Sequence, residues 1–374
     1  MDKRIDVFDT LRFFAIMPVA IHHAYSPGAP GGYLGVYLFF VISGYLIAFT
    51  VQRQSTLSFL ARRICRIYIP MMVLLSVWLF LARDKFATGD LFDMLLGNVL
   101  VYKVSTLGVG TAVLWTLHAE IWFYILAPLL FFPLRRLEHG VYITLGLVAA
   151  LAALALAIRF GRFDLGGYPF SLTLRYFHCF AVGIVLYILK HNLSGDKTSF
   201  LAGGFGYTLC LASLLVLMLM NFLPSKNLTR EYSELAYAIL GAVIAATAMS
   251  NNLKFDNPLT VNIGRISYSM YLIHGIILDF RLVTQARNLL MGIGFYKLLN
   301  IPAQLTTGHY LLLYLSMLLT LSAAAYFAVE KPGISLGRVL ARRLRVFHIP
   351  SFGAPGVPGP AYQTEAAPPP GPQT

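Results

Sequence analysis

The sequence contains few charged residues. Of its 374 residues only 12% are charged, about half of the roughly 25% that is usual in a soluble domain. Hydrophobic residues make up 57% of the chain, and the mean hydropathy is +0.69. A chain of this kind has too little polar surface to cover a soluble core. We therefore predict an all-α membrane protein, built as a polytopic bundle of transmembrane helices.

Other scarce features exclude particular kinds of site. The only cysteines are Cys65, Cys179 and Cys210, and none forms a CxxC pair, so we expect neither a disulfide framework nor a thiolate metal site. HExxH, P-loop and GxSxG motifs are missing, which argues against a zinc protease, an ATPase and an α/β-hydrolase. Acidic residues close to the N-terminus are atypical of a cleavable signal peptide, so the first helix is expected to stay as an anchor.

About ten apolar segments are long enough to span a bilayer. We place them near 9–26, 34–51, 67–83, 113–133, 140–159, 170–190, 199–220, 233–250, 266–284 and 309–330. The chain has 29 Lys and Arg residues and a formal net charge of +13. Basic residues collect in cytoplasmic loops, so we attribute this charge to topology and expect no nucleic-acid partner. Their distribution predicts that both termini lie inside.

We expect one membrane domain over residues 1–347, followed by a tail over 348–374. The tail is rich in Pro, Gly and Ala and has few large apolar residues. Such a composition cannot bury a core, and it predicts a disordered cytoplasmic extension.

The first apolar segment carries ionisable residues at membrane depth. Arg12 and His23 are eleven residues apart, which returns to within about 20° of the same helix face and roughly 16 Å further along. His22 falls about 80° away from that face. Charge inside a membrane is costly, so such residues indicate a functional site.

Two further segments admit a structural or a functional interpretation. Ser43 and Gly44 are small residues that favour close packing of a neighbouring helix. Arg63 and Arg66, expected at the start of the third helix, share a face. They either fix the topology or bind phosphate groups, which guanidinium groups hold in a bidentate manner.

The remaining polar positions lie on later helices. Glu120 sits inside an apolar segment with Tyr124 one turn away, either as a structural salt-bridge partner or in a dry reactive site. Ser267, Tyr271 and His274 follow i, i+4, i+7 and predict an inward polar stripe, although an isolated histidine is commonly a hydrogen-bonded interior residue. The sequence Glu330-Lys331-Pro332 predicts a helix end.

In this order, these segments resemble the motifs of acyltransferase family 3, integral-membrane enzymes that O-acylate polysaccharides and other glycans. The matching motifs are Asp9-x-x-Arg12-x-x-Ala15 with His23, Gly35-Val-x-Leu-Phe-Phe-Val-Ile-Ser-Gly-Tyr-Leu-Ile, Arg63-x-x-Arg66, Trp115-Thr-Leu-x-x-Glu120-x-x-Phe-Tyr124-x-x-x-Pro128, Ser267-Tyr-Ser-x-Tyr-Leu-x-His274 and Glu330-x-Pro332. Tyr37 departs from the family, which usually has an acidic residue there, and His118 is also unusual at its position.

The resemblance implies a mechanism. An acyl-CoA, most often acetyl-CoA, would enter from the cytoplasm, with its phosphates on Arg63 and Arg66 and its arm beside Arg12. His23 would act as general base on a sugar hydroxyl or carry the acyl group itself, and imidazole suits either task because its pKa is near 7. Glu120 would orient that imidazole and stabilise its charge.

The resemblance also implies the surroundings of the reaction. Trp115, Tyr124 and His274 would line the cavity, together with the stripe residues Ser267 and Tyr271. No metal and no bound cofactor is expected; acyl-CoA is a co-substrate. The expected acceptor is a cell-envelope or exported glycan, and the expected location is the bacterial inner membrane, with multiple passes. Transfer of succinyl, transfer to a lipid or small metabolite, and a transporter remain the alternatives.

Overall fold

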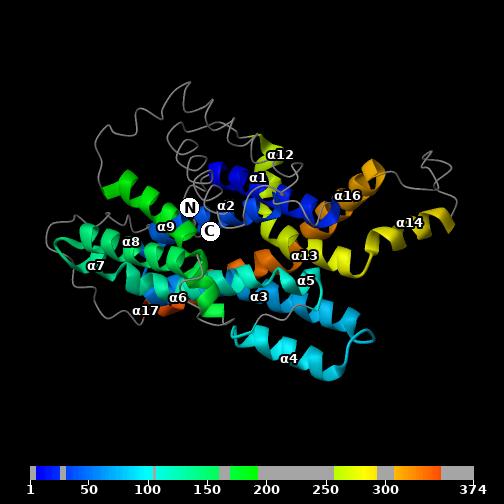
Figure 1. Ribbon diagram of the computed structural model, residues 1–374, viewed down its shortest axis with the longest axis horizontal. Coiled ribbons are helices and arrows are strands. Elements are labelled where there is room, and N and C mark those ends of the chain that lie inside the picture. Colours follow the sequence, from blue (N-terminus) through cyan, green and yellow to red (C-terminus); the bar gives the residue numbers. More distant parts are fainter. Residues whose placement is uncertain are drawn as a thin grey trace, which may run out of the picture.

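The computed structural model describes residues 6–25, 31–103, 107–159, 169–192, 257–292 and 307–346 (Figure 1). Within these ranges the regular structure is helical throughout, without strands, which confirms the all-α prediction for this part of the chain. The helices are α1 (Asp6–Tyr25), α2 (Gly31–Val51), α3 (Thr56–Ala82), α4 (Thr88–Val99), α5 (Val109–Ala112), α6 (Trp115–Leu130), α7 (Phe132–Arg136), α8 (Gly140–Arg159), α9 (Pro169–Asn192), α12 (Pro258–Arg265), α13 (Ser267–Asp279), α14 (Leu282–Gly292), α16 (Thr307–Ala325), the π-helix η2 (Tyr326–Glu330) and α17 (Lys331–Val346).

Four of the described helical stretches are long and apolar enough to cross a membrane: Thr56–Ala82, Val109–Arg136, Gly140–Ile158 and Thr307–Leu344. Gly35–Val51 and Thr173–Leu189 are shorter apolar helices. These six correspond to six of the segments expected from the sequence. The expected spans at 199–220 and 233–250, and the tail at 348–374, lie outside the described residues, so the count of about ten stays a prediction.

Two boundaries differ from the expectation in ways that affect the site. α3 begins at Thr56 rather than at 67, because Ser55 caps its first turn by accepting a hydrogen bond from the Ser58 amide. Arg63 and Arg66 therefore lie inside α3 and not at its start. The single span expected at 266–284 begins where α13 begins but is not one helix. α13 ends at Asp279, the chain turns at Arg281, which has a φ of 49°, and α14 begins at Leu282; α12 precedes the expected span.

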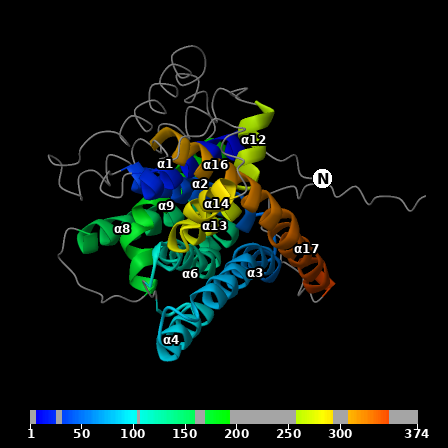
Figure 2. The ribbon, with the colours of Figure 1, turned by 90° about the vertical axis from the view of Figure 1, so that its right-hand side faces the viewer.

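The expected helix end at Glu330-Lys331-Pro332 is wrong as well. The helix continues through the π-helical turn η2 into α17, which packs along α3 (Figure 2). Pro332 is tolerated because it is the second residue of α17, directly after the π-helical turn. The continuous stretch from Thr307 to Leu344 has 38 residues, about 57 Å at 1.5 Å per residue. It exceeds the hydrocarbon thickness of roughly 30 Å.

The centre of the bundle is formed by α1, α2, α6, α9 and α13, with α8 outside α9 (Figure 1). Glycine allows α2 and α9 to approach closely. A Cβ added to Gly44 would lie 2.2 Å from the carbonyl oxygen of Phe180, and one added to Gly183 would lie 2.0 Å from that of Val41. This confirms the packing role expected for Gly44.

Candidate active site

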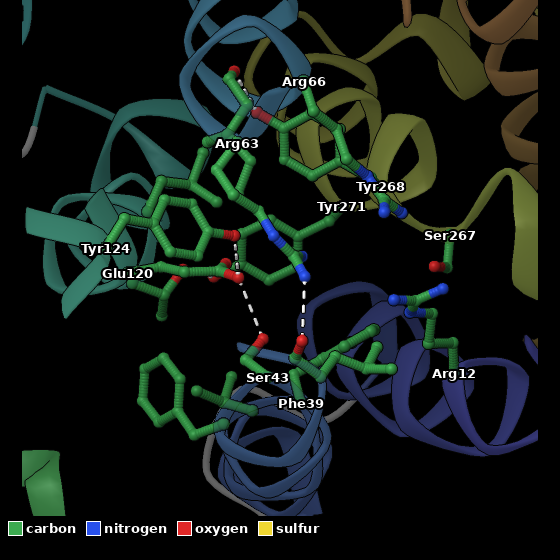
Figure 3. A pocket seen from close by; sticks show the side chains of 16 residues that line it. Arg12, Phe39, Ser43, Arg63, Arg66, Glu120, Tyr124, Ser267, Tyr268 and Tyr271 are labelled. Carbon is green, nitrogen blue, oxygen red and sulfur yellow. Dashed lines mark hydrogen bonds between the residues drawn. The ribbon is translucent and has the colours of Figure 1, made fainter. Parts of the chain in front are cut away.

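A cavity of about 80 Å³ opens between five helices of the bundle. It exceeds the space that one water molecule needs, roughly 10–15 Å³, so it admits polar ligand groups. Figure 3 shows polar side chains pointing into it from α1, α2, α3, α6 and α13. The labelled lining residues are Arg12, Phe39, Ser43, Arg63, Arg66, Glu120, Tyr124, Ser267, Tyr268 and Tyr271.

Two of the three arginines in the cavity are held by neighbouring groups. Arg12 donates from Nη1 to Oδ1 of Asp9 over 2.9 Å, and the Asp9 carboxylate is almost fully buried. Arg63 donates from Nη2 to the carbonyl oxygen of Leu46 (3.1 Å) and to Oγ1 of Thr50 (2.8 Å). Its guanidinium carbon lies 5.7 Å from the ring centre of Tyr124, within cation–π range.

Arg66 differs from both. It lines the same cavity, yet among the described residues it makes no hydrogen bond and no close ion pair. The charges that act on Arg66 include those of Glu330 and of the other two arginines. Arg66 therefore offers its guanidinium donors to a ligand, while Arg12 and Arg63 are partly satisfied by the protein.

Glu120 is the acidic group of the cavity. Its Oε1 accepts hydrogen bonds from Oγ of Ser43 (2.9 Å) and from the hydroxyl of Tyr124 (2.5 Å) (Figure 3). Within the described ranges it forms no salt bridge, so its direct partners are these two hydroxyls, while the charge of Arg63 acts on it from further away. Its hydrogen bonds do not go to His23, the partner expected from the sequence.

His23 lies outside the cavity lining, towards the other end of α1. Its half-buried ring contacts two other histidines: the ring centres are 4.9 Å from His22 and 5.2 Å from His274. His274 is fully buried. Because α1 is helical from Arg12 to His23, these residues are separated by roughly 16 Å along its axis. The site thus has a cationic region and a histidine region on the same helix.

The other expected residues divide between these regions. Ser267 and Tyr271 line the cavity, and the Tyr271 hydroxyl donates to the Val113 carbonyl oxygen (2.9 Å) while accepting from Thr116 Oγ1 (2.8 Å). Trp115 is not part of the lining. Its ring packs against Tyr176 (4.8 Å) and against Phe40 (6.1 Å), and Phe40 does face the cavity.

Several contributors were not identified from the sequence. Asp9 and Ser43 were visible in the motifs, but their hydrogen bonds to Arg12 and Glu120 were not foreseen. Tyr268 lines the cavity and donates to the carbonyl oxygen of Ile67 (2.6 Å). Glu330 is buried by the π-helical turn and accepts from Oγ of Ser269 (2.7 Å). In the part of the chain that the structure describes, no three His, Cys, Asp or Glu residues are grouped as a metal site.

These groups lie in motifs that extend over most of the chain, and so does the match to known proteins. The sequence profile of acyltransferase family 3, described as an acyltransferase domain, matches residues 5–327. The chain belongs to this acyltransferase family. Its long apolar helices agree with the membrane character of the family.

Two curated relatives illustrate the similarity. The chain is 27% identical to the O-acetyltransferase OatA of Staphylococcus aureus over 309 residues, which are 73% of this chain and 50% of the relative. It is 25% identical to nodulation protein 10 of Rhizobium leguminosarum over 382 aligned positions, which cover 91% of this chain and 96% of the relative. The chain thus spans about half the length of the staphylococcal relatives it matches. No solved structure matches it.

Proposed function

We propose that this acyltransferase moves an acyl group, usually acetyl, from cytoplasmic acyl-CoA to a hydroxyl group of a cell-envelope or exported glycan in the bacterial inner membrane. The observation that carries the proposal is the convergence of Arg12, Arg63 and Arg66 on one cavity, with His23 further along α1. Similarity to a named O-acetyltransferase supports O-acyl transfer.

The cavity suits the phosphates of an acyl-CoA. Three guanidinium groups at membrane depth are costly unless anions compensate them. Asp9 compensates Arg12, and among the described residues that line the cavity Glu120 is the one carboxylate. Guanidinium groups match phosphate oxygens with paired donors. Arg66, whose donors are free among the described residues, is the first phosphate ligand in this proposal, and Arg63 is the second.

The histidine region suits the chemical step. A neutral imidazole takes a proton near pH 7, and the half-buried ring of His23 is open to an acceptor. His23 removes the proton from the acceptor hydroxyl, whose oxygen attacks the thioester carbonyl carbon. The new C–O bond forms, the C–S bond breaks, and the CoA thiolate receives the proton. An acyl-imidazole formed on His23 gives the same overall balance in two steps.

Glu120 takes a role in the donor cavity in this proposal. It holds the hydroxyls of Ser43 and Tyr124, and the ring of Tyr124 in turn lies against the guanidinium of Arg63. The carboxylate thereby fixes the Tyr124 ring that contacts Arg63. It also balances part of the local positive charge. Ser267 and Tyr271 complete the wall of the donor cavity beside the acyl-CoA arm, and Trp115 supports this wall from behind through Phe40.

The test compares glycans from cells that carry the wild type or His23→Ala. Mass spectrometry of envelope and secreted glycans should show that an acetyl-sized or succinyl-sized mass is lost from one glycan in the variant, because the base is removed. The variant must reach the membrane at the wild-type level. A lipid extract and a metabolite extract, measured in parallel, distinguish the other acceptors. Unchanged acylation in all three fractions would remove His23 from the mechanism.

A further inference from the structure

His274 is a buried histidine whose nitrogens have no regular hydrogen-bond partner. Its ring is inaccessible to solvent. Among the described residues, neither Nδ1 nor Nε2 makes a hydrogen bond of ordinary geometry. The nearest backbone acceptors belong to Met270 and Tyr271, in the preceding turn of the same helix. Buried polar groups are nearly always paired, so an exception requires an explanation.

The backbone around His274 is held rigidly. Gly275 packs directly on Gly110, because an added Cβ would lie 2.3 Å from the Gly110 Cα atom. One turn later, the Asp279 carboxylate accepts hydrogen bonds from the amides of Val109 (2.7 Å) and Gly110 (2.8 Å) and from Nε1 of Trp78 (2.7 Å). α13 is thereby fixed to α5 and α3, and the backbone position of His274 is fixed with it.

The imidazole of His274 lies next to that of the proposed base. The ring centres of His274 and His23 are 5.2 Å apart, with 38° between the ring planes. At this separation the two rings lie close together without a hydrogen bond from either nitrogen of His274, and catalytic hydrogen bonds commonly tighten only when substrate is bound. The other polar or charged groups near His274 are His22, Tyr271 and Asp279.

We propose that His274 is the positioning residue of His23. In this arrangement one nitrogen of His23 takes the proton of the acceptor hydroxyl, and its other nitrogen donates a hydrogen bond to His274. The contact selects the His23 tautomer that can act as a base and stabilises the imidazolium that forms. A carboxylate performs this task in the Ser-His-Asp triad. A neutral histidine does so without a permanent charge at membrane depth, where charge is costly.

This inference rests on the proposed function of His23, and it replaces Glu120 as the partner of that residue. Glu120 is occupied by Ser43 and Tyr124, whereas the nitrogens of His274 are available. The role is separable from binding of the donor, because His274 is not among the residues that line the arginine cavity.

The experiment measures acyl transfer from acetyl-CoA by purified protein in nanodiscs, using the acceptor fraction that the His23 comparison identifies. We expect His274→Phe to lower kcat about 10- to 100-fold, equivalent to about 1.4–2.8 kcal/mol, with an unchanged KM for acetyl-CoA. His274→Asn and His274→Gln retain an acceptor oxygen and should recover part of kcat. His118→Phe is the matched control, because it removes a buried histidine of another helix, α6, whose ring nitrogen bonds Asn98 on α4 instead of contacting His23.

Each outcome decides the proposal. If His274→Phe keeps the wild-type kcat, if it raises only KM, or if the amide variants are no better than Phe, His274 does not position His23. If His118→Phe lowers kcat equally, the effect is structural and the proposal fails. His274→Leu replaces the Phe variant if the latter does not insert. An active His23→Ala overturns both the role of His23 and this inference, whereas an inactive His23→Ala beside an active His274→Phe overturns only the inference.

Discussion

At the scale of single residues, the arginines show what spacing can and cannot predict. The i, i+3 spacing of Arg63 and Arg66 predicted a shared face, and both line the cavity. It did not predict that their surroundings differ. Arg63 is satisfied by Leu46 and Thr50 of α2, and that contact depends on how two helices pack. The free donors of Arg66 could be recognised only after α1, α2 and α3 were placed together.

This difference makes Arg66 the sharper test of donor binding. We expect Arg66→Ala to weaken CoA binding by about 1.5–3 kcal/mol, the scale of a hydrogen bond to a charged group. Isothermal titration of the protein in nanodiscs measures the Kd. Arg342→Ala removes an equal charge from the exposed face of α17 and should leave the Kd unchanged. Equal affinity of Arg66→Ala and the wild type, in folded and inserted protein, would exclude Arg66 as a phosphate ligand.

Glu120 shows how far the partners of a buried acidic residue can be predicted from sequence. The sequence placed it on an apolar helix and correctly singled out Tyr124 as its neighbour one turn away. Its second partner, Ser43, is 77 positions distant in the chain. The same pattern was compatible with a contact to His23, since both residues occupy polar positions on apolar helices. Helix rotation and depth decide between such partners, and neither follows from periodicity in a single segment.

At the scale of helices, the small residues in the sequence predicted one side of the interface between α2 and α9. Gly44 was expected to admit a neighbouring helix, and it does so against Phe180 of α9. The reciprocal residue, Gly183, was not identified, because an isolated glycine in an apolar helix has no distinguishing pattern. The π-helical turn η2 was also missed. It leads directly into α17, which contains Pro332, and it buries Glu330 beside Ser269, where the sequence indicated only a helix end.

The α2–α9 interface gives a prediction about stability. Gly183→Ala places a methyl group 2.0 Å from the Val41 carbonyl oxygen, and backbone cannot move aside as a flexible side chain does. We expect a loss of about 1–3 kcal/mol, the usual cost of overpacking, seen as a lower thermal midpoint in detergent. Gly146→Ala on α8 is the control, because its Cβ meets nothing within 4 Å. It should be neutral or slightly stabilising. Equal midpoints for the two variants would contradict the close approach of α2 and α9.

At the scale of the whole molecule, composition predicted the helical membrane class and six of the apolar helices. It failed where one span is built from short pieces. The segment expected at 266–284 contains α13 and the start of α14, which are separated by a turn at Arg281. Ser267 and Tyr271, both on α13, line the cavity. The polar stripe was therefore predicted correctly, while the element that carries it was not.

The topology of the chain decides which compartment can supply acyl-CoA to the arginine cavity in this proposal. Arg63 and Arg66 lie in the N-terminal half of α3, and Arg135 and Arg136 end α7 after α6. Basic residues favour the cytoplasmic side, which places Glu138 inside and Asp84, beyond the other end of α3, outside. Both positions are exposed. A membrane-impermeant maleimide should label Asp84→Cys in spheroplasts, and Glu138→Cys only after permeabilisation.

The native thiols do not obscure this measurement. Cys65 and Cys179 are buried, and Cys210→Ser removes the remaining cysteine from the background. The expected labelling places the arginine cavity near the cytoplasmic end of α3, where acyl-CoA is available. Reversed labelling would mean that the guanidinium groups lie near the outer side of the membrane. In this proposal acyl-CoA is present only on the cytoplasmic side. The cavity would then have to bind a different anion, although the histidine region would keep its geometry.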